Sequence, residues 1–213
     1  MFPRALFLTL GKFDENFAPA YYEDTDFAFS VRKNGKKVYF QPASVITHFE
    51  GKSHGTDESL GIKQNQLINQ GKFREKWAQV LDEQHFENAE HVLQARERSR
   101  GKTTVLVIDH YVPHFDKDAG SRSTFLYLQL LVQSGFNVKF LGDNFFKHEP
   151  YTSLLQDMGI EVLYGNYYQK NWEKWLRDHA GYIDVAYMMR PHIAGPYIDV
   201  VNELKPRPRT IYF

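Results

Sequence analysis

The sequence predicts an α/β fold in two parts, with short strands and helices in the first part and a doubly wound parallel sheet in the second. Three observations lead to this prediction. In residues 21–35, three acids stand at the start of a helical apolar pattern that ends at a glycine. Residues 87–98 are largely charged, as is typical of a solvated connecting segment. After Lys102, short apolar runs alternate with helical patterns, which indicates right-handed βαβ units.

The composition excludes several classes of protein. With 213 residues, 42% of them hydrophobic and 24% charged, the chain has the composition of a globular protein with one large or two modest domains. The formal net charge of +0 gives no indication of nucleic acid as a partner. The chain has no cysteine, so disulfides and thiolate metal sites are excluded. No apolar run approaches the ~20 residues of a membrane span, and we expect a cytoplasmic protein.

The acid-rich stretch in residues 21–35 is the first candidate site. Glu23, Asp24 and Asp26 directly precede apolar residues at helical spacing. Carboxylates at the start of a helix lie where free backbone N–H groups and the helix dipole favour negative charge. Gly35 is placed to end this helix as a C-terminal cap. Acids are also ordinary helix-start signals, so plain capping is an alternative to a catalytic role.

The segment after this helix predicts a hairpin followed by helices. Residues 36–40 and 44–47 form two short β-prone runs around Pro42, as in a hairpin or an edge strand. His48 ends the second run, and a neutral imidazole is a good ligand for a divalent metal; a structural histidine is the alternative. From Asp57 onward apolar residues recur at helical spacing, with Phe73 and Trp77 as candidate core residues.

The order of these motifs resembles the C-terminal half of the catalytic domain of family 2 glycosyltransferases, which have a GT-A fold. The resemblance covers about residues 4–77. It is carried by the Gly11-Lys-Phe-Asp-Glu turn, the Tyr22-Glu-Asp-Thr-Asp helix start, the run that ends at His48, and the string of Asn69, Phe73, Lys76 and Trp77. Leu10-Gly11-Lys12 replaces the glycine pair that is usual in the family.

The resemblance implies roles for individual residues. Asp24 would be the general base that takes the proton of an acceptor hydroxyl, with Glu23 beside it as a second catalytic acid. Substrate contacts are implied for Asp26, Tyr22 and Trp77. His48 would complete a Mn²⁺ or Mg²⁺ site, whose full coordination needs the donor-binding half that precedes this segment in the family.

The second half of the chain predicts a parallel sheet. Residues 104–109 form a continuous apolar run that ends in Asp109, as expected of a buried parallel strand. A loop leads to Gly120, where a helix is predicted, and residues 137–141 form the next strand. The same alternation predicts helices at 151–158, 172–179 and 197–204 and strands at 160–164, 183–189 and 210–213. Pro196 fits the first position of the last helix.

Residues 105–144 resemble the start of a GT-B glycosyltransferase of the family 4 type, whose N-terminal domain is a Rossmann-like sheet. The resemblance is carried by the strand that ends in Asp109, the Asp118-Ala-Gly-Ser-Arg segment and the Gly135 turn. It implies that Gly120, Ser121 and Arg122 face a cleft, where the start of a helix can hold a phosphate or a sugar hydroxyl. Plain helix capping is the alternative.

Arg190 and His192 follow another predicted strand, at the end where open α/β sheets bind ligands. The resemblance implies donor or acceptor contacts for both residues, whereas loop positions without a ligand are the alternative. Asp109 and Asp116 have the same two interpretations.

We therefore expect residues 1–83 to be the C-terminal half of a GT-A domain, residues 84–102 a helical linker, and residues 103–213 the N-terminal domain of a GT-B enzyme. Such a chain would be a fragment of a larger bacterial enzyme. That enzyme would transfer a sugar from a nucleotide-sugar donor to a glycan or lipid-linked glycan acceptor during synthesis of a cell-surface polysaccharide. The longer parent protein would associate peripherally with the inner face of the membrane. The alternative is a non-catalytic module that binds nucleotides or sugar phosphates, or a scaffold.

Overall fold

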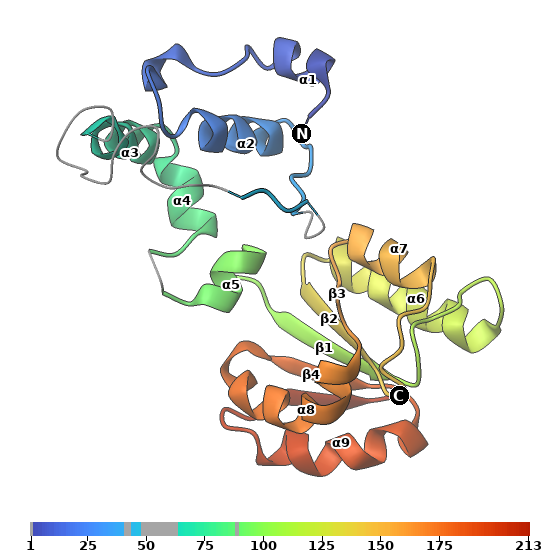
Figure 1. Ribbon diagram of the computed structural model, residues 1–213. Coiled ribbons are helices and arrows are strands. Elements are labelled where there is room, and N and C mark those ends of the chain that lie inside the picture. Colours follow the sequence, from blue (N-terminus) through green and yellow to red (C-terminus); the bar gives the residue numbers. More distant parts are fainter. Residues whose placement is uncertain (1, 41–43, 48–63, 88–89) are drawn as a thin grey trace. The chain divides into compact units, whose positions relative to one another are not determined.

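The computed structural model describes residues 2–40, 44–47, 64–87 and 90–213. The chain divides into two compact units, Met1–Asp82 and Glu83–Phe213. Figure 1 shows helices in the first unit and a sheet flanked by helices in the second. Within the described ranges, no helix is both long enough and apolar enough to cross a membrane.

The first unit is helical in its described part. Its elements are α1 (Arg4–Thr9), the short 3₁₀ helix η1 (Glu15–Phe17), α2 (Glu23–Lys33), α3 (Gln64–Lys76) and α4 (Ala78–Gln84), which extends just past the division between the units. Phe17, Phe73 and Trp77 form its small buried core, with Tyr22 and Phe29 packed against them. The aromatic residues of α3 and of its C-terminal end therefore hold η1 and α2 together.

The helix predicted in residues 21–35 is confirmed as α2. Gly35 follows it with a φ of +69°, and its N–H donates to the carbonyl of Arg32 at 2.9 Å. A left-handed glycine directly after a helix satisfies carbonyls that have no partner inside the helix. The three acids lie in the first turn of α2, as the sequence predicts.

The two strands predicted in residues 36–40 and 44–47 are not formed, and this prediction is wrong. Both segments lack regular secondary structure, and Phe40, Val45 and Ile46 are 85–89% exposed. A strand is stable only when a neighbour pairs with its N–H and C=O groups. No strand occurs elsewhere in the described part of residues 1–82 to provide that pairing. The β propensity of these residues therefore has no sheet to join.

The second unit contains a five-stranded parallel sheet, which confirms the predicted doubly wound α/β class. The strands are β1 (Thr104–Asp109), β2 (Asn137–Gly142), β3 (Glu161–Leu163), β4 (Val185–Met188) and β5 (Arg209–Tyr212), in the order β3-β2-β1-β4-β5. All neighbouring pairs are parallel. This is a Rossmann-like arrangement with β1 at the centre.

Helices cover both faces of the sheet because successive side chains of a strand point to opposite faces. Val105 and Val107 of β1 pack with α6 (Ala119–Gln133) and α7 (Tyr151–Asp157). Leu106 and Ile108 pack with α8 (Asn166–Asp178), the short η3 (Ala180–Tyr182) and α9 (Pro191–Glu203). All six residues of β1 are buried, as its continuous apolar run predicts.

Three boundaries differ from the sequence prediction. Helix α8 begins at Asn166, six residues before the predicted start at Trp172. The last helix, α9, begins at Pro191, so Pro196 lies inside it rather than at its first position. The buried side chains of α9 already begin at Ile193 and Ala194, and this packing sets the earlier start. The segment predicted as a linker contains α5 (Val92–Glu97), which belongs to the second unit.

Candidate functional site

The candidate site lies where the order of the parallel strands reverses. From β1 the chain goes first to β2 and β3 on one side, and later to β4 and β5 on the other. In open α/β sheets, ligands bind at the carboxyl ends of the strands at this switch point. Asp109 is the last residue of β1, and Arg190 follows the end of β4. Both residues therefore reach the place where a ligand is expected.

Arg190 and Asp109 form an ion pair across the switch point. The Nε of Arg190 donates to Oδ1 of Asp109 at 2.7 Å, and the side chain of Asp109 is 3% exposed whereas that of Arg190 is 36% exposed. Thr124 of α6 donates its hydroxyl to Oδ2 of Asp109 at 2.8 Å, and the N–H of His110 donates to Oδ1 at 2.7 Å. The carboxylate is thus fixed on several sides and orients the guanidinium.

The backbone of Arg190 is strained. Its φ of +67° and ψ of 110° lie outside the regions that residues with a side chain normally occupy. Its N–H donates to the carbonyl of Phe213 at 3.0 Å, which ties the end of β4 to the end of β5. Such conformations cost about 1–3 kcal/mol and cluster at functional sites. The strain and the ion pair together direct the guanidinium toward the start of α6.

Gly120 makes room for this guanidinium. A Cβ atom at Gly120 would lie 3.1 Å from Nη2 of Arg190 and 3.3 Å from Oδ1 of Asp118. Asp118 caps α6 and accepts from both the N–H and the hydroxyl of Ser121, each at 2.7 Å. These bonds from Ser121 hold the pKa of Asp118 below its ordinary value. The predicted Gly120-Ser121 segment therefore lies beside Arg190, with a carboxylate already at the helix start.

The remaining residues predicted for the second unit lie outside this cluster. Arg122 and His192 are exposed, and neither contributes to the Arg190–Asp109 pair. Asp116 accepts from the hydroxyl of Tyr151, and this bond lowers the pKa of Asp116. Thr124 and Asp118 complete the site but were missed by sequence reasoning. A threonine on the inner face of the helix after a strand that ends in aspartate is a pattern that could have identified Thr124.

A pair of histidines lies beside the site in the loops after β1 and β2. The rings of His114 and His148 are 4.8 Å apart, and His114 stacks on Tyr151 at 4.4 Å. Asn144 lies 3.0 Å from Nε2 of His148. Burial, and then the nearby His114, lower the pKa of His148. His148 therefore favours the neutral imidazole.

In the first unit, the structure separates the three predicted acids. Asp24 is exposed, and its Oδ1 accepts from the N–H of Thr25 at 2.6 Å and from the hydroxyl of Thr25 at 3.2 Å. Glu23 is half-buried, and its Oε2 is buried without a hydrogen-bond partner among the described residues. Asp26 is 3% exposed. Of the three residues, only Asp24 is classed as exposed.

Asp26 serves the packing of the first unit. It accepts from Nε1 of Trp77 at 2.8 Å and from Nζ of Lys76 at 2.9 Å, and Trp77 is 6% exposed. Neither of these two predicted substrate contacts is therefore open to a substrate. Lys76 also pairs with Asp14 at 2.8 Å. Burial alone would lower the pKa of Lys76, but its bonds to Asp14 and Asp26 raise it.

Two further predictions for the first unit concern Tyr22 as a substrate contact and His48 as a metal ligand. Tyr22 is half-buried, and its ring lies 5.3 Å from that of Phe73. His48 lies outside the described residues. Within the described residues, no group of three or more His, Cys, Asp or Glu side chains is placed to hold a metal ion. The predicted Mn²⁺ or Mg²⁺ site therefore stays a prediction.

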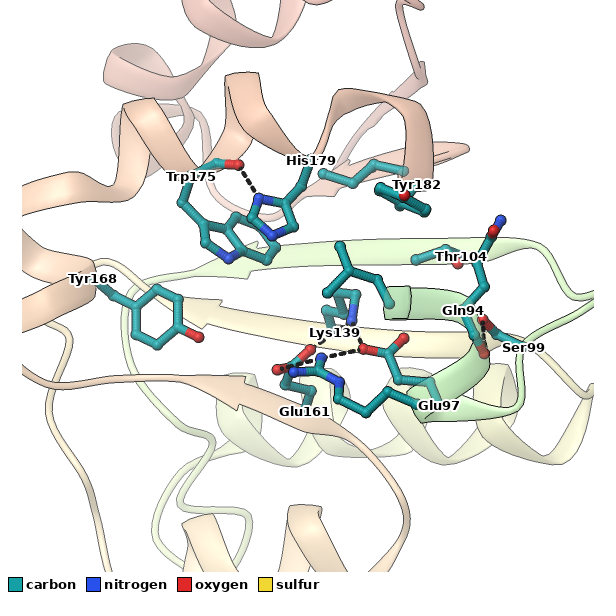
Figure 2. Close-up of a pocket in the computed structure, with 13 residues that line it drawn as sticks. Gln94, Glu97, Ser99, Thr104, Lys139, Glu161, Tyr168, Trp175, His179 and Tyr182 are labelled. Carbon is teal, nitrogen blue, oxygen red and sulfur yellow. Dashed lines mark hydrogen bonds and ion pairs between the residues drawn. The ribbon is translucent and has the colours of Figure 1, made fainter. Parts of the chain in front are cut away.

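A second charged cluster lies in a pocket at the amino-terminal ends of the strands, opposite the switch point. Figure 2 shows Lys139 of β2 between Glu97 of α5 and Glu161 of β3, with Trp175 and His179 across the pocket. Lys139 pairs with both carboxylates, and Arg96 pairs with the same two. Two cations thus neutralise two anions.

The Lys139 cluster has a structural role, because its charges are paired with one another and those of Lys139 and Glu97 are largely buried. The side chain of Lys139 is 4% exposed. Burial would raise the pKa of Glu97, but its bond from Lys139 and its contacts with Arg96 and Asn137 lower it to about 2. Every charge in the cluster has a protein partner, so the pocket offers no free charge to a ligand. The switch point is the better candidate site, although Asp109 and Arg190 do not line this pocket.

Comparisons of this chain with protein-family models, with curated proteins and with solved structures find no match.

Proposed function

We propose that this chain belongs to a glycosyltransferase and that its second unit binds sugar hydroxyls at the β1–β4 switch point. The observation that carries the proposal is the strained Arg190, held by Asp109 with its guanidinium beside Gly120. Nε of Arg190 is bonded to Asp109, and the described residues give its terminal nitrogens no hydrogen-bond acceptor. A guanidinium fixed in this way can still donate to a ligand.

The charge balance of the site favours a hydroxylated ligand over a bare phosphate. The carboxylates of Asp109 and Asp118 lie close to the single guanidinium of Arg190. A phosphate would be repelled by the carboxylate at the start of α6, although an uncapped helix start attracts anions. A sugar hydroxyl both donates and accepts. It can therefore use Arg190 as a donor and Asp118 as an acceptor.

In the first unit, the proposal gives Asp24 the role of general base on the acceptor hydroxyl, as the resemblance to family 2 implies. Its carboxylate is exposed in the first turn of α2. A carboxylate within hydrogen-bond reach of a hydroxyl can take the proton as the new glycosidic bond forms. Asp26 is buried against Trp77 and takes no part in this step. No step depends on the predicted metal.

Titration of the ¹⁵N-labelled chain, followed by two-dimensional NMR, tests the binding site. We expect free sugars and nucleotide sugars to shift the amide signals of residues 109–111 and 119–122 and those of Arg190 and His192, whereas inorganic phosphate alone leaves them unchanged. Arg190→Lys should abolish the sugar-induced shifts because lysine lacks the forked donors of arginine. Arg209→Lys, the same change at an exposed position in β5, is the control and should bind like the wild type.

Other results of the titration would contradict the proposal. Shifts centred on Lys139 and Glu97 would move the site to the other edge of the sheet. Equal shifts with phosphate would favour the alternative function, a module that binds sugar phosphates or nucleotides without catalysis.

Sugar transfer tests the role of Asp24. The family resemblance places the donor-binding half upstream of residue 4, so the assay uses a polypeptide extended in that direction. Asp24→Asn keeps an oxygen that can accept from Thr25 but cannot act as a base, and turnover should fall by about 10²–10⁴-fold. Glu15→Gln, which removes an exposed acid in η1, is the charge-matched control. Unchanged turnover in Asp24→Asn would remove Asp24 from the mechanism.

A further inference from the structure

Two consecutive tyrosines enter α2 with a left-handed backbone. Tyr21 and Tyr22 have φ values of +75° and +73°, and Glu23 and Asp24 follow them as the first two residues of the helix. A left-handed conformation is strained for a bulky residue and persists only when its surroundings enforce it. The direction in which the two acids leave the turn therefore depends on whatever holds these two tyrosines.

Asn69 of α3 is placed to hold this turn. Its side chain is 1% exposed, and its Nδ2 donates to the carbonyl oxygens of Phe17, Ala20 and Tyr21 at 2.8, 2.9 and 3.1 Å. An asparagine amide has two hydrogens, so one of them is shared between two acceptors. A single buried side chain thus connects three carbonyls in the five residues before Tyr22.

Other residues on the same face of α3, and Trp77 directly after it, bond to residues on either side of the two tyrosines. Lys72, Phe73, Lys76 and Trp77 follow Asn69 by three, four, seven and eight residues, which places them along one side of the helix. Lys72 donates to the carbonyl of Asn16 at 2.7 Å, and Lys76 and Trp77 bond to Asp26. This side of α3 is therefore a template for residues 14–26, with Asn69 as its buried member.

We propose that Asn69 is a positioning residue: by fixing the carbonyls of Phe17, Ala20 and Tyr21 it keeps Tyr21 and Tyr22 left-handed and so sets the positions of Glu23 and Asp24. The proposal rests on the proposed function for its catalytic consequence. Its structural claim, that the amide of Asn69 enforces the backbone of the two tyrosines, is independent of any activity.

The test compares Asn69→Asp with Gln70→Glu. Aspartate has the shape of asparagine but presents only acceptors when it is ionised, so it repels the three carbonyls. Gln70→Glu adds the same charge at an exposed neighbouring position of α3. The first readout is the strong NMR contact between the amide and α protons of a residue with positive φ. We expect it to be lost at Tyr21 and Tyr22 in Asn69→Asp and to stay in Gln70→Glu.

The second readout is sugar transfer in the upstream-extended polypeptide. Displacement of a catalytic group by about 1 Å can reduce the rate about 10²-fold, so kcat should fall by about that factor in Asn69→Asp. KM for the donor should not change, because Asn69 does not contact it in the proposed arrangement. A general loss of folded protein would instead reduce the signal of every assay equally. Gln70→Glu should match the wild type.

The two readouts separate failure of this proposal from failure of the proposed function. Retention of the positive-φ signals in Asn69→Asp would overturn the proposal, and so would their loss with an unchanged kcat. Absence of sugar transfer in the wild type, or equal transfer in Asp24→Asn, would overturn the proposed function, while the NMR signals would still decide the structural claim.

A second variant covers the case in which Asn69→Asp does not fold, as judged by loss of its helical circular dichroism. Asn69→Ser buries no charge, and its single hydroxyl can donate to only one of the three carbonyls. We expect weaker positive-φ signals at Tyr21 and Tyr22 in this variant. Signals identical to those of the wild type would overturn the proposal.

Discussion

Charged clusters lie at both ends of the parallel strands, but they differ in the balance of charge: two cations face two carboxylates at the amino-terminal ends, whereas one guanidinium lies near two carboxylates at the carboxyl-terminal ends. At the amino-terminal ends of the strands, Lys139 and Arg96 each contact Glu97 and Glu161. The two positive charges therefore balance the two negative charges. At the carboxyl-terminal ends of the strands, Arg190 donates to Asp109 through Nε, and its terminal nitrogens have no hydrogen-bond acceptor among the described residues. We infer that the matched cluster around Lys139 stabilises the fold, and we propose that the incompletely paired Arg190 serves ligand binding.

The largest expected effect breaks the matched cluster around Lys139. Lys139→Met leaves Glu97 and Glu161 close together with only Arg96 to neutralise them. Removal of one partner of a buried ion pair costs about 3–5 kcal/mol, and we expect a loss of this size in the free energy of unfolding of the second unit, measured by urea denaturation. Sugar-induced shifts at Arg190 and His192 should be unchanged in the folded variant. A loss below about 1 kcal/mol, as for an exposed pair, would contradict the view that this cluster is structural.

Acid should weaken the same cluster through Glu97. Its pKa is about 2 in the folded chain and 4.5 ordinarily, so its contribution to stability is fully present above pH 4.5 and is lost as the pH falls toward about 2. A shift of this size corresponds to a contribution on the order of 3 kcal/mol. Urea denaturation across this pH window should show a smaller decrease in stability for Glu97→Gln than for the wild type. Parallel pH profiles would contradict the prediction.

A smaller effect is expected from loosening the cluster around Arg190. Thr124→Val removes the hydroxyl that donates to Oδ2 of Asp109, and both side chains are buried. Loss of such a bond should cost about 1–2 kcal/mol of unfolding free energy and weaken sugar binding, because Asp109 orients Arg190. Ser123→Ala, at the exposed neighbouring position of α6, is the control. Wild-type sugar affinity in Thr124→Val would show that Arg190 does not need this support.

The smallest change in stability is expected at Gly120. A methyl group there would lie 3.1 Å from Nη2 of Arg190, so the guanidinium must shift. Alanine also favours a helix over glycine, and the unfolding free energy of Gly120→Ala should stay within about 1 kcal/mol of the wild type. Sugar binding should nevertheless weaken in NMR titrations. Undiminished binding would show that the space beside Gly120 is not used.

The sheet could be predicted from the sequence because short apolar or β-prone runs alternate with helical patterns. In the 104–109 run, alternate side chains pack against helices on both faces, and only a parallel sheet with two covered faces needs such a run. The start of α9 could not be predicted because its buried face begins before Pro196. Packing decided that boundary, and the proline signal alone indicated a later one.

The candidate site was predicted only in part. Gly120, Ser121 and Arg190 follow strands or begin a helix, so the topology rule places them near the switch point. The pairing of Arg190 with Asp109 spans 81 residues and has no local signal. The burial of Asp26 likewise depends on Trp77, which is 51 residues away. Local acid clusters indicate the start of a helix, but distant partners decide which acid faces solvent.

The contact of α5 with the sheet has a consequence for where the second unit can be separated from the first. Glu97 and Arg96 bring two of the four charges in the cluster that includes Lys139. A version that starts at Gly101 would therefore keep a buried ammonium with only one of its carboxylates. Proteolysis or recombinant truncation should therefore yield an independently folding module only when the cut falls before Val92. The segment that looks like a tether in the sequence is then the first structural element of the module.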